Sequence, residues 1–518
     1  MKNLTTPLLP RGFARIIVLV LFPALLHAEV KLASPFASHM VLQRDMKVPV
    51  WGAAEPGEQV TVEFAGQKKS VKADVDGQWR VDLKPLKASA ESRTFVVTGS
   101  KTSQPIKLDD VVVGEVWLAS GQSNMDFSVS KKVKYFSGVI NEEQEIAAAN
   151  YPLIRMFTGT AVRAYEPKPT VPGKWEVCSP ETVPAFSAVG YFFARELQKK
   201  IKIPVGIVTL SYGASTAEAW IRRETMAADP QLKPMLDRFD MAVQSFRTNP
   251  PPVVAAPRSE DVSATNAAPG GRRRGGGGPR DPVQDQHNAT VLFNGMIHPV
   301  IPFALRGVIW YQGESIVGGA EGRALYPRVQ AALINDWRAL WGQGNFPFYI
   351  VQLAALKANS NSPEVREAQA TALALPNTGM VVTIDIGDPK DVHPHNKQDV
   401  GDRLARIALA NLHGRKLEFS GPMYDSMKVE GSVVRLKFAH VGGGLVAKGG
   451  ALKWFTIAGA DGKFIPAEAK IAGKSVVVSS ADVKVPVAVR YAWDSYPEGC
   501  NLYNTDGLPA APFRTDKH

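Results

Sequence analysis

Residues 111–125 read VVVGEVWLASGQSNM, an apolar run that ends abruptly in small and polar residues. The run Val111–Ala119 is apolar enough for a strand that is buried on both faces. The corner that follows it precedes an expected helix start. A serine at such a corner of an open parallel sheet projects its hydroxyl from the carboxyl edge, where these folds bind ligands. The stretch predicts an α/β fold with Ser123 at that edge, although a helix-capping serine would fit the same residues when taken alone.

Apolar strands and helical patterns alternate along the chain downstream of this corner. Such alternation indicates a parallel sheet that helices cover on both faces. The expected strands are Val205–Leu210, Gly307–Tyr311, Pro347–Leu353 and Met380–Ile386, and the expected helices are Gly190–Lys200, Ala324–Trp341 and Lys397–Leu412.

Two of these strands end in residues that suit a reaction at a carbonyl group. Gly213 follows the strand at Val205–Leu210, and a glycine lets a backbone amide approach a substrate closely. Gln312 follows the strand at Gly307–Tyr311, and its side-chain amide could donate to an oxyanion. Glu314 could hold a catalytic histidine or a neighbouring loop.

A serine nucleophile needs a base to activate it and an acid to orient that base. Asp391 and His393 supply both, between the strand at Met380–Ile386 and the next helix. Asp388, Asp391, His393 and His395 could instead bind a metal ion, since His-x-His on an extended segment can face one ion. That alternative leaves the serine corner unexplained, so we expect no metal and no cofactor.

Together these motifs resemble the SGNH (GDSL-like) hydrolase superfamily and, within it, the sialate O-acetylesterase family. The resemblance covers nearly all of the chain after residue 28, apart from residues 245–288. It implies a three-layer α/β/α core with a parallel sheet, flanked by small antiparallel β domains. The motifs that carry it are Gly121–Met125, Ala217–Trp220, Phe293–Pro299, Gly307–Ser315, Asp391–Asp402, Asn501–Asn504 and Leu508–Phe513.

The resemblance implies a serine carbohydrate esterase that removes O-acetyl groups from sugars through an acyl-enzyme on Ser123. His393 would take the serine proton and deliver it to the leaving sugar oxygen, and Asp391 would orient the imidazole. The superfamily often places this acid three residues before the histidine, where this chain has Lys390. Asp388 is therefore kept as the alternative acid.

The resemblance also implies an oxyanion hole. The backbone N–H groups of Ser123 and Gly213 would form part of it, with the amide of Gln312 as the third donor. The superfamily usually has asparagine at the position of Gln312. Glu314 and Asp388 would support the site.

The chain divides into several expected segments. Residues 1–28 have the charged start and short apolar run of a signal peptide. Residues 29–108 and 416–518 have the short alternating runs of antiparallel β domains, and residues 109–415 form the catalytic domain. Residues 245–288 are rich in Pro, Gly and Arg, and are expected to be a disordered surface insertion.

The signal peptide predicts export, either to the periplasm or out of the cell. No later run approaches the length of about 18 apolar residues that a membrane span needs, so none is expected. The formal charge of +11 comes partly from Arg272–Arg274 in the insertion, and for an exported protein it does not indicate a nucleic-acid partner. Cys178 and Cys500 allow either one disulfide or two buried thiols.

An acetylated sugar or glycan is the expected partner, and the sequence leaves the oligomeric state open. The substrate is expected to be O-acetylated sialic acid. The alternative substrate is an acetylated plant or algal polysaccharide such as xylan. A non-catalytic carbohydrate-binding protein is a further alternative, against which the serine, histidine and acid set argues.

Overall fold

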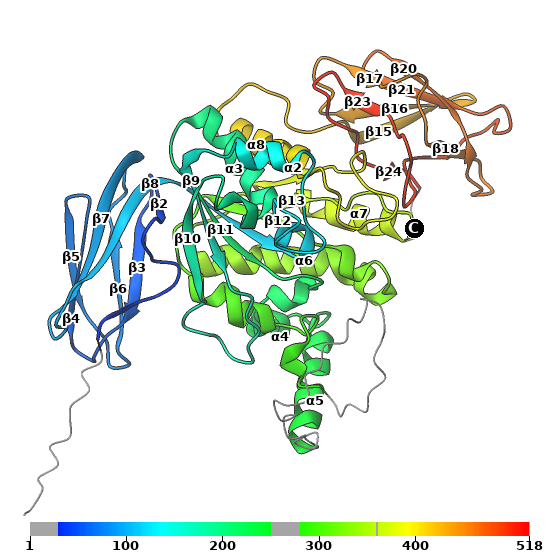
Figure 1. The fold of residues 1–518 in the computed structure, drawn as a ribbon. Helices are drawn as coiled ribbons and strands as arrows, with labels where there is room; N and C mark the ends of the chain where they lie inside the picture. The colour runs from blue at the N-terminus through cyan, green and yellow to red at the C-terminus, as the bar shows by residue number, and fades with distance from the viewer. Residues whose placement is uncertain (1–28, 250–279, 359–360, 517–518) are drawn as a thin grey trace, which may run out of the picture.

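One long strand, β8 (Ile106–Gly121), organises the computed structural model, which describes residues 29–249, 280–358 and 361–516 (Figure 1). Its first half pairs with β7 (Ser89–Gly99) in antiparallel fashion. Its second half pairs in parallel with β11 (Val205–Ser211) and β12 (Gly307–Tyr311). The same strand therefore belongs to the N-terminal sheet and to the central sheet, and the expected domain boundary between residues 108 and 109 falls inside it.

The central sheet has the strand order β10-β9-β11-β8-β12-β13-β14. Every neighbouring pair from β9 to β14 is parallel, and β10 is an antiparallel edge strand. The strands not yet located are β9 (Tyr151–Gly159), β10 (Gly173–Cys178), β13 (Phe348–Val351) and β14 (Thr378–Val381).

The strand expected at Met380–Ile386 ends earlier than its apolar residues suggest. β14 stops at Val381, and the carbonyl of Val382 accepts a hydrogen bond of 2.7 Å from the Arg403 guanidinium. The next residues turn, with the Ile386 N–H donating to the Thr383 carbonyl. This early end starts the loop that carries Asp391 and His393.

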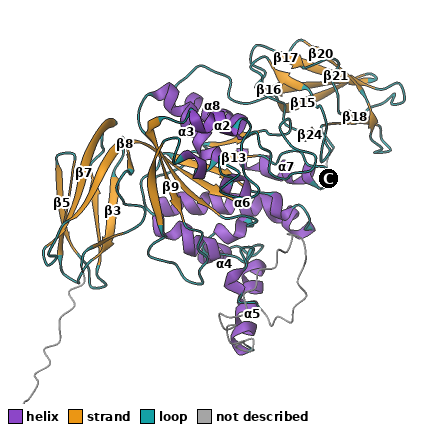
Figure 2. Cartoon of the chain, in the orientation of Figure 1, coloured by secondary structure: helices purple, strands orange, loops and turns teal. Residues whose placement is uncertain are grey.

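Helices cover both faces of the central sheet, as expected (Figure 2). On β8, Trp117 packs in a core with α3 (Ala188–Ile201) and α8 (Lys397–His413), whereas the next residue, Leu118, packs in the core that includes α6 (Ala320–Trp341). Because neighbouring residues of a strand point to opposite faces, the sheet is the middle of three layers. The predicted α/β/α architecture is confirmed.

The other helical segments are shorter or lie outside the two main layers. The remaining α-helices are α1 (Ser123–Asp126), α2 (Glu142–Ala147), α4 (Arg223–Ala228), α5 (Lys233–Thr248) and α7 (Ser362–Ala370). Single turns are η1 (Val183–Ala185), η2 (Ala217–Trp220), η3 (Pro282–Gln284), η4 (Phe293–Ile297), η5 (His298–Val300), η6 (Glu314–Ile316) and η7 (Thr371–Ala374).

Small β-sheets lie before and after the central sheet (Figure 1). In the N-terminal region, β1, β3 and β6 form one antiparallel sheet; β4, β5, β7, β2 and the first half of β8 form the facing one. Their shared core includes Val50, Val62 and Phe95. These strands are β1 (Lys31–Leu32), β2 (Val41–Gln43), β3 (Val48–Ala53), β4 (Gln59–Phe64), β5 (Gln67–Lys72) and β6 (Gln78–Leu83).

The C-terminal region contains three antiparallel sheets, with orders β15-β16-β21-β20, β17-β23 and β19-β18-β22-β24. Inward residues such as Leu436 and Val476 are fully buried. The strands are β15 (Met423–Glu430), β16 (Val433–Ala439), β17 (Leu445–Ala447), β18 (Phe455–Ala458), β19 (Ile465–Pro466), β20 (Glu468–Ala472), β21 (Ser475–Ser479), β22 (Ala488–Tyr491), β23 (Leu502–Asn504) and β24 (Phe513–Arg514).

The described residues bear on several further expectations. Residues 1–28 and 250–279 lie outside the described ranges. The expected signal peptide and most of the expected insertion therefore lie outside them as well. At its two ends that insertion is helical, in α5 and η3, so the prediction of disorder is wrong for these ends. Within the described ranges, no helix is long and apolar enough to span a membrane.

The two cysteines are free thiols and both are buried. Cys178 lies in the core on the α3 and α8 side of the sheet, whereas Cys500 lies in the other core. Burial raises the pKa of Cys178 to about 12 and that of Cys500 to about 11. Of the two alternatives left open by the sequence, the structure has the buried thiols.

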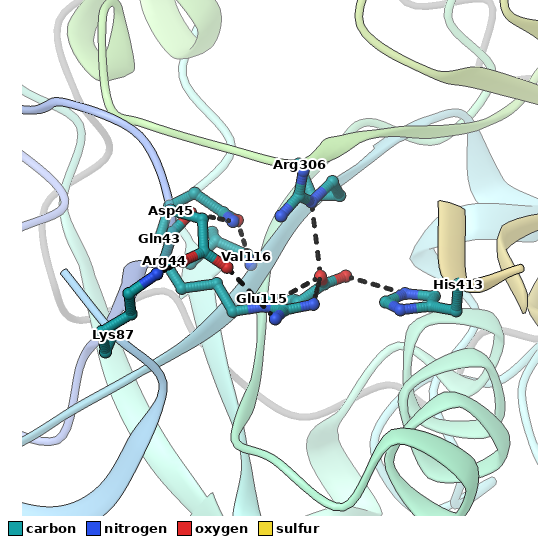
Figure 3. A network of polar contacts seen from close by, with 8 residues as sticks. All are labelled: Gln43, Arg44, Asp45, Lys87, Glu115, Val116, Arg306 and His413. Atoms are coloured by element: carbon teal, nitrogen blue, oxygen red, sulfur yellow. Dashed lines mark hydrogen bonds and ion pairs between the residues drawn. The ribbon is translucent and has the colours of Figure 1, made fainter. Parts of the chain in front are cut away.

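A buried carboxylate at the amino end of the central sheet ties distant segments together (Figure 3). Glu115 of β8 is fully buried, and Arg44, which follows β2, donates to its Oε1 at 2.7 Å. Arg306, which precedes β12, forms an ion pair with it at 3.3 Å, and the Nε2 atom of His413, which ends α8, lies 3.3 Å from its Oε2. Burial alone would raise the pKa of Glu115, but these three neighbours outweigh it and lower that pKa to about 2.

We expect Glu115→Gln to lower the free energy of unfolding at neutral pH by about 3–5 kcal/mol, because it leaves Arg44 and Arg306 with no buried counter-charge. The Glu115 pKa is 4.5 in an unperturbed chain and about 2 in the fold. Its contribution is therefore complete above pH 4.5 and is lost as the pH falls toward 2. Urea unfolding at neutral pH and at about pH 4 measures both effects.

The matched control is Glu63→Gln, which removes an exposed carboxylate paired with Lys68. It should change the free energy of unfolding by no more than about 1 kcal/mol. Equal effects of the two substitutions would contradict a special role for Glu115.

Candidate active site

The predicted nucleophile and base meet at the carboxyl edge of the central sheet. Ser123 is the first residue of α1, two positions after the end of β8, and His393 lies in the loop between β14 and α8. The Nε2 atom of His393 lies 2.9 Å from the Oγ atom of Ser123. That separation is within the hydrogen-bonding reach that a general base requires.

The same loop places a carboxylate on the far side of the imidazole. Asp391 Oδ1 lies 3.3 Å from His393 Nδ1 and accepts a hydrogen bond of 2.8 Å from the His393 backbone N–H. Asp388 instead accepts from the backbone N–H groups of Lys390 and Asp391, at 2.7 and 3.0 Å. These bonds lower the pKa of Asp388. The geometry favours Asp391 as the orienting acid. Asp388 instead stabilises the turn at residues 388–391.

Gly213 lies immediately beside the serine. A Cβ atom added to this glycine would be 3.8 Å from the Cβ of Ser123. Among the hydrogen bonds between described residues, none uses the backbone N–H of Ser123 or of Gly213. Two donors next to the serine hydroxyl are therefore available to a developing oxyanion.

Gln312 departs from the expected role of third donor. Its side chain is fully buried, its Nε2 donates to the Ser215 carbonyl at 3.1 Å, and its Oε1 accepts from the Tyr326 hydroxyl at 2.8 Å. These contacts connect the loop that carries Gly213 to α6. The structure thus gives Gln312 the part of positioning that loop, because the α6 tyrosine holds its amide in the interior.

Asn124, the residue after the serine, joins three of the loops. Its Nδ2 donates to Glu314 Oε1 at 2.5 Å and to the Val392 carbonyl at 3.0 Å. Its Oδ1 accepts from Lys397 Nζ at 2.5 Å. One amide therefore connects the serine, the supporting Glu314 and the loop of His393, and holds them in a fixed relation.

Lys397 is a site residue that the motif analysis missed. It is fully buried in the first turn of α8, with its ammonium group 4.6 Å from the centre of the Phe127 ring. Burial lowers its pKa to about 7, against the attraction of Glu314 and Asp391. A lysine in the first turn opposes the helix dipole, and that is the signal in the sequence that could have identified it.

Glu314 and His393 are also perturbed by burial. Burial raises the pKa of Glu314, which the hydrogen bond from Asn124 and the charge of Lys397 only partly offset. Burial likewise lowers the pKa of His393, while Asp391 acts to raise it and Lys397 acts to lower it further. The lowered pKa favours the neutral imidazole, which is the form that can accept a proton.

Gln122 is a second residue that the motif analysis did not single out. Its Oε1 accepts from the Gly313 backbone N–H and from the Ser315 hydroxyl, both at 3.3 Å. It thus fixes the residue before the serine to the loop that follows β12. In the described part of the chain, no three His, Cys, Asp or Glu side chains converge as they would around a metal ion.

Comparisons with known proteins agree with the resemblance. A family model described as "Carbohydrate esterase, sialic acid-specific acetylesterase" matches residues 286–410. The sialate O-acetylesterase of Mus musculus is 28% identical over 552 residues, which cover 93% of this chain and 94% of that one. The Homo sapiens protein of the same name is 28% identical over 532 residues, covering 93% and 92%.

A solved structure is more similar still. The crystal structure of a carbohydrate acetylesterase from Xanthomonas citri matches with a TM-score of 0.79 and 36% sequence identity. The match covers 94% of this chain and 100% of that one. These relatives are enzymes, which sets aside the non-catalytic carbohydrate-binding alternative.

The acid limb of the pH profile for p-nitrophenyl acetate hydrolysis should report His393. Because its pKa lies below the ordinary value of 6.5, kcat/KM should fall only at pH values below that. Lys397→Met removes a cation that opposes protonation of the imidazole, so the limb should move to higher pH, by about 0.5–1 unit.

Lys390→Met is the matched control, since Lys390 is exposed on the same loop. It should leave the limb in place. A uniform loss of activity in Lys397→Met without any movement of the limb would show that Lys397 acts on structure alone.

Proposed function

Since the chain belongs to the sialate O-acetylesterase family and is an esterase that removes O-acetyl groups from sugars, we propose that it works through an acyl-enzyme on Ser123. The observation that carries this proposal is the 2.9 Å separation between Ser123 Oγ and His393 Nε2. It joins a hydroxyl and an imidazole that are 270 residues apart, at the ligand-binding edge of the sheet.

In the proposed first half-reaction, His393 takes the hydroxyl proton as Ser123 Oγ attacks the acetyl carbonyl carbon. The resulting oxyanion is stabilised by the backbone N–H groups of Ser123 and Gly213, each contributing about 2.7–4 kcal/mol. His393 then gives the proton to the sugar oxygen, and the sugar leaves. Asp391 holds the imidazole and stabilises its charged form.

In the second half-reaction, water replaces the sugar. His393 takes a proton from the water, which attacks the acetyl-serine, and the proton returns to Ser123 as acetate leaves. The buried contacts of Asn124 keep His393 in place through both halves. Neither half-reaction uses a cofactor.

The proposed substrate is O-acetylated sialic acid. Support comes from the matching family description, which is specific for sialic acid, and from the names of the curated mammalian relatives. The Xanthomonas citri relative is named only as a carbohydrate acetylesterase, so acetylated polysaccharide such as xylan is the competing substrate.

We expect Ser123→Ala to lower acetate release from O-acetylated sialic acid by about 10⁴-fold or more, because it removes the nucleophile. Ser120→Ala is the matched control: this serine lies on β8, and its buried hydroxyl has no hydrogen-bond partner among the described residues. It should keep the activity of the wild type. Retained activity in Ser123→Ala would overturn the acyl-enzyme.

The substrate is tested separately on the wild-type protein. We expect kcat/KM for acetate release to be higher with O-acetylated sialic acid than with acetyl-xylan. The reverse order would replace the proposed substrate and leave the serine mechanism intact.

We further propose that the protein is exported, to the periplasm or out of the cell. The support is the charged and apolar composition of residues 1–28. Sequencing of the mature N-terminus after expression should find Glu29 as the first residue. A mature chain that still begins at Met1 would overturn this proposal.

A further inference from the structure

An aromatic pair extends from the catalytic histidine to the surface. The ring of Phe136 stacks on the imidazole of His393, with centroids 4.7 Å apart and an interplanar angle of 28°. The ring of Tyr135 meets Phe136 edge to face, at 5.2 Å and 86°. Together the two distances keep the rings of Tyr135 and His393 within about 10 Å of each other.

Tyr135 is 97% exposed, although it stands beside the reacting groups. Val133 and Ile140, on the same loop, are 44% and 46% exposed. An aromatic side chain carries a large apolar surface that favours a packed partner, and apart from the edge contact with Phe136 this one faces solvent. Tyr135 therefore presents apolar surface within about 10 Å of the His393 ring.

This exposure does not come from a loosely attached loop. Lys134 Nζ binds Asp126 at the end of α1, through Oδ2 at 2.6 Å and the carbonyl oxygen at 2.9 Å. Asp126 Oδ1 in turn accepts from the Ser211 hydroxyl at the end of β11. The loop is also closed at its base, where the Val139 N–H donates to the Val129 carbonyl at 3.0 Å. Tyr135 is thus presented on a support that is fixed to the serine helix.

The loop is also positively charged. Lys131 and Lys132 are exposed, and neither forms an ion pair with any residue that the structure describes. The carboxylate of Glu142 accepts from the Ser130 hydroxyl and from the Lys131 backbone N–H, and among the described residues it forms no ion pair with either lysine. Two ammonium groups without an ion-pair partner, on the loop that carries Tyr135, favour a negatively charged ligand over a neutral one.

We propose that residues 131–136 form a sugar-binding wall, in which Tyr135 stacks on the sugar portion of the substrate while Lys131 and Lys132 attract its carboxylate. The inference rests on the proposed function and deepens it, because it identifies residues that select an acidic sugar. The two ring distances keep Tyr135 within about 10 Å of the imidazole that contacts Ser123, so a sugar whose acetyl group lies at Ser123 can extend toward the ring. A neutral polysaccharide would use the aromatic ring and gain nothing from the lysines.

The aromatic part is tested with Tyr135→Ala. We expect kcat/KM for O-acetylated sialic acid to fall about five- to twentyfold, mainly through a higher KM, because a stacked ring contact is lost. The kcat/KM for p-nitrophenyl acetate, which has no sugar, should stay unchanged. Tyr135→Phe keeps the ring and should behave as the wild type. Trp454→Ala, which removes an exposed aromatic side chain from the C-terminal region, is the control and should change neither value.

The charged part is tested with the double variant Lys131→Gln/Lys132→Gln. Its kcat/KM for O-acetylated sialic acid should fall about five- to tenfold at low salt, with a smaller effect at high salt because the charges are screened. The double variant Lys72→Gln/Lys107→Gln makes the same change of charge on exposed residues of the N-terminal sheets. It should have no effect.

Three results would overturn the proposal of a sugar-binding wall. One is an equal loss of p-nitrophenyl acetate hydrolysis in Tyr135→Ala, which would mean that the ring acts through His393. Another is no loss with any acetylated sugar. The third is the same loss in both double lysine variants, which would mean that net charge alone matters. If the wild type prefers acetyl-xylan, the proposed substrate fails and the lysine part with it, whereas the Tyr135 part is then judged on acetyl-xylan.

Discussion

The register of three parallel strands is the constraint on which the site depends. Gly121 at the end of β8 pairs with Ser211 of β11 and with Tyr311 of β12. A Cβ at Gly121 would lie 2.1 Å from the Tyr311 carbonyl oxygen, and its φ is +134°, so only glycine fits. Because the three strands end at the same level, the residues that follow them, Ser123, Gly213 and Gln312, are brought to one place.

The pKa values of buried ionisable groups shift in different ways at the two edges of this sheet. At the amino edge, Glu115 contacts two arginines and a histidine, and its pKa falls although it is buried. At the carboxyl edge, burial dominates: it raises the pKa of Glu314 and lowers that of Lys397. The first pattern stabilises a charge and joins parts of the fold. The second leaves groups whose charge is costly, which is the pattern that active sites show.

The C-terminal region supports the site without contributing a reacting group. Tyr503, which lies on β23, donates to Asp385 at 3.2 Å, and the guanidinium of Arg403 binds both oxygens of the same carboxylate. Asp385 lies between the end of β14 and the loop of His393. The small β-sheets therefore help to set the path of that loop.

The sequence by itself determined the α/β class, the serine corner and the loop with Asp391 and His393, because apolar periodicity and turn chemistry are local properties. The tertiary structure alone decided that β8 belongs to two sheets, that Gln312 faces the interior and that Lys397 is buried beside Asn124. Those outcomes depend on strand register and on which loops meet. Both are set by packing between residues that are hundreds of positions apart, and no local pattern records them.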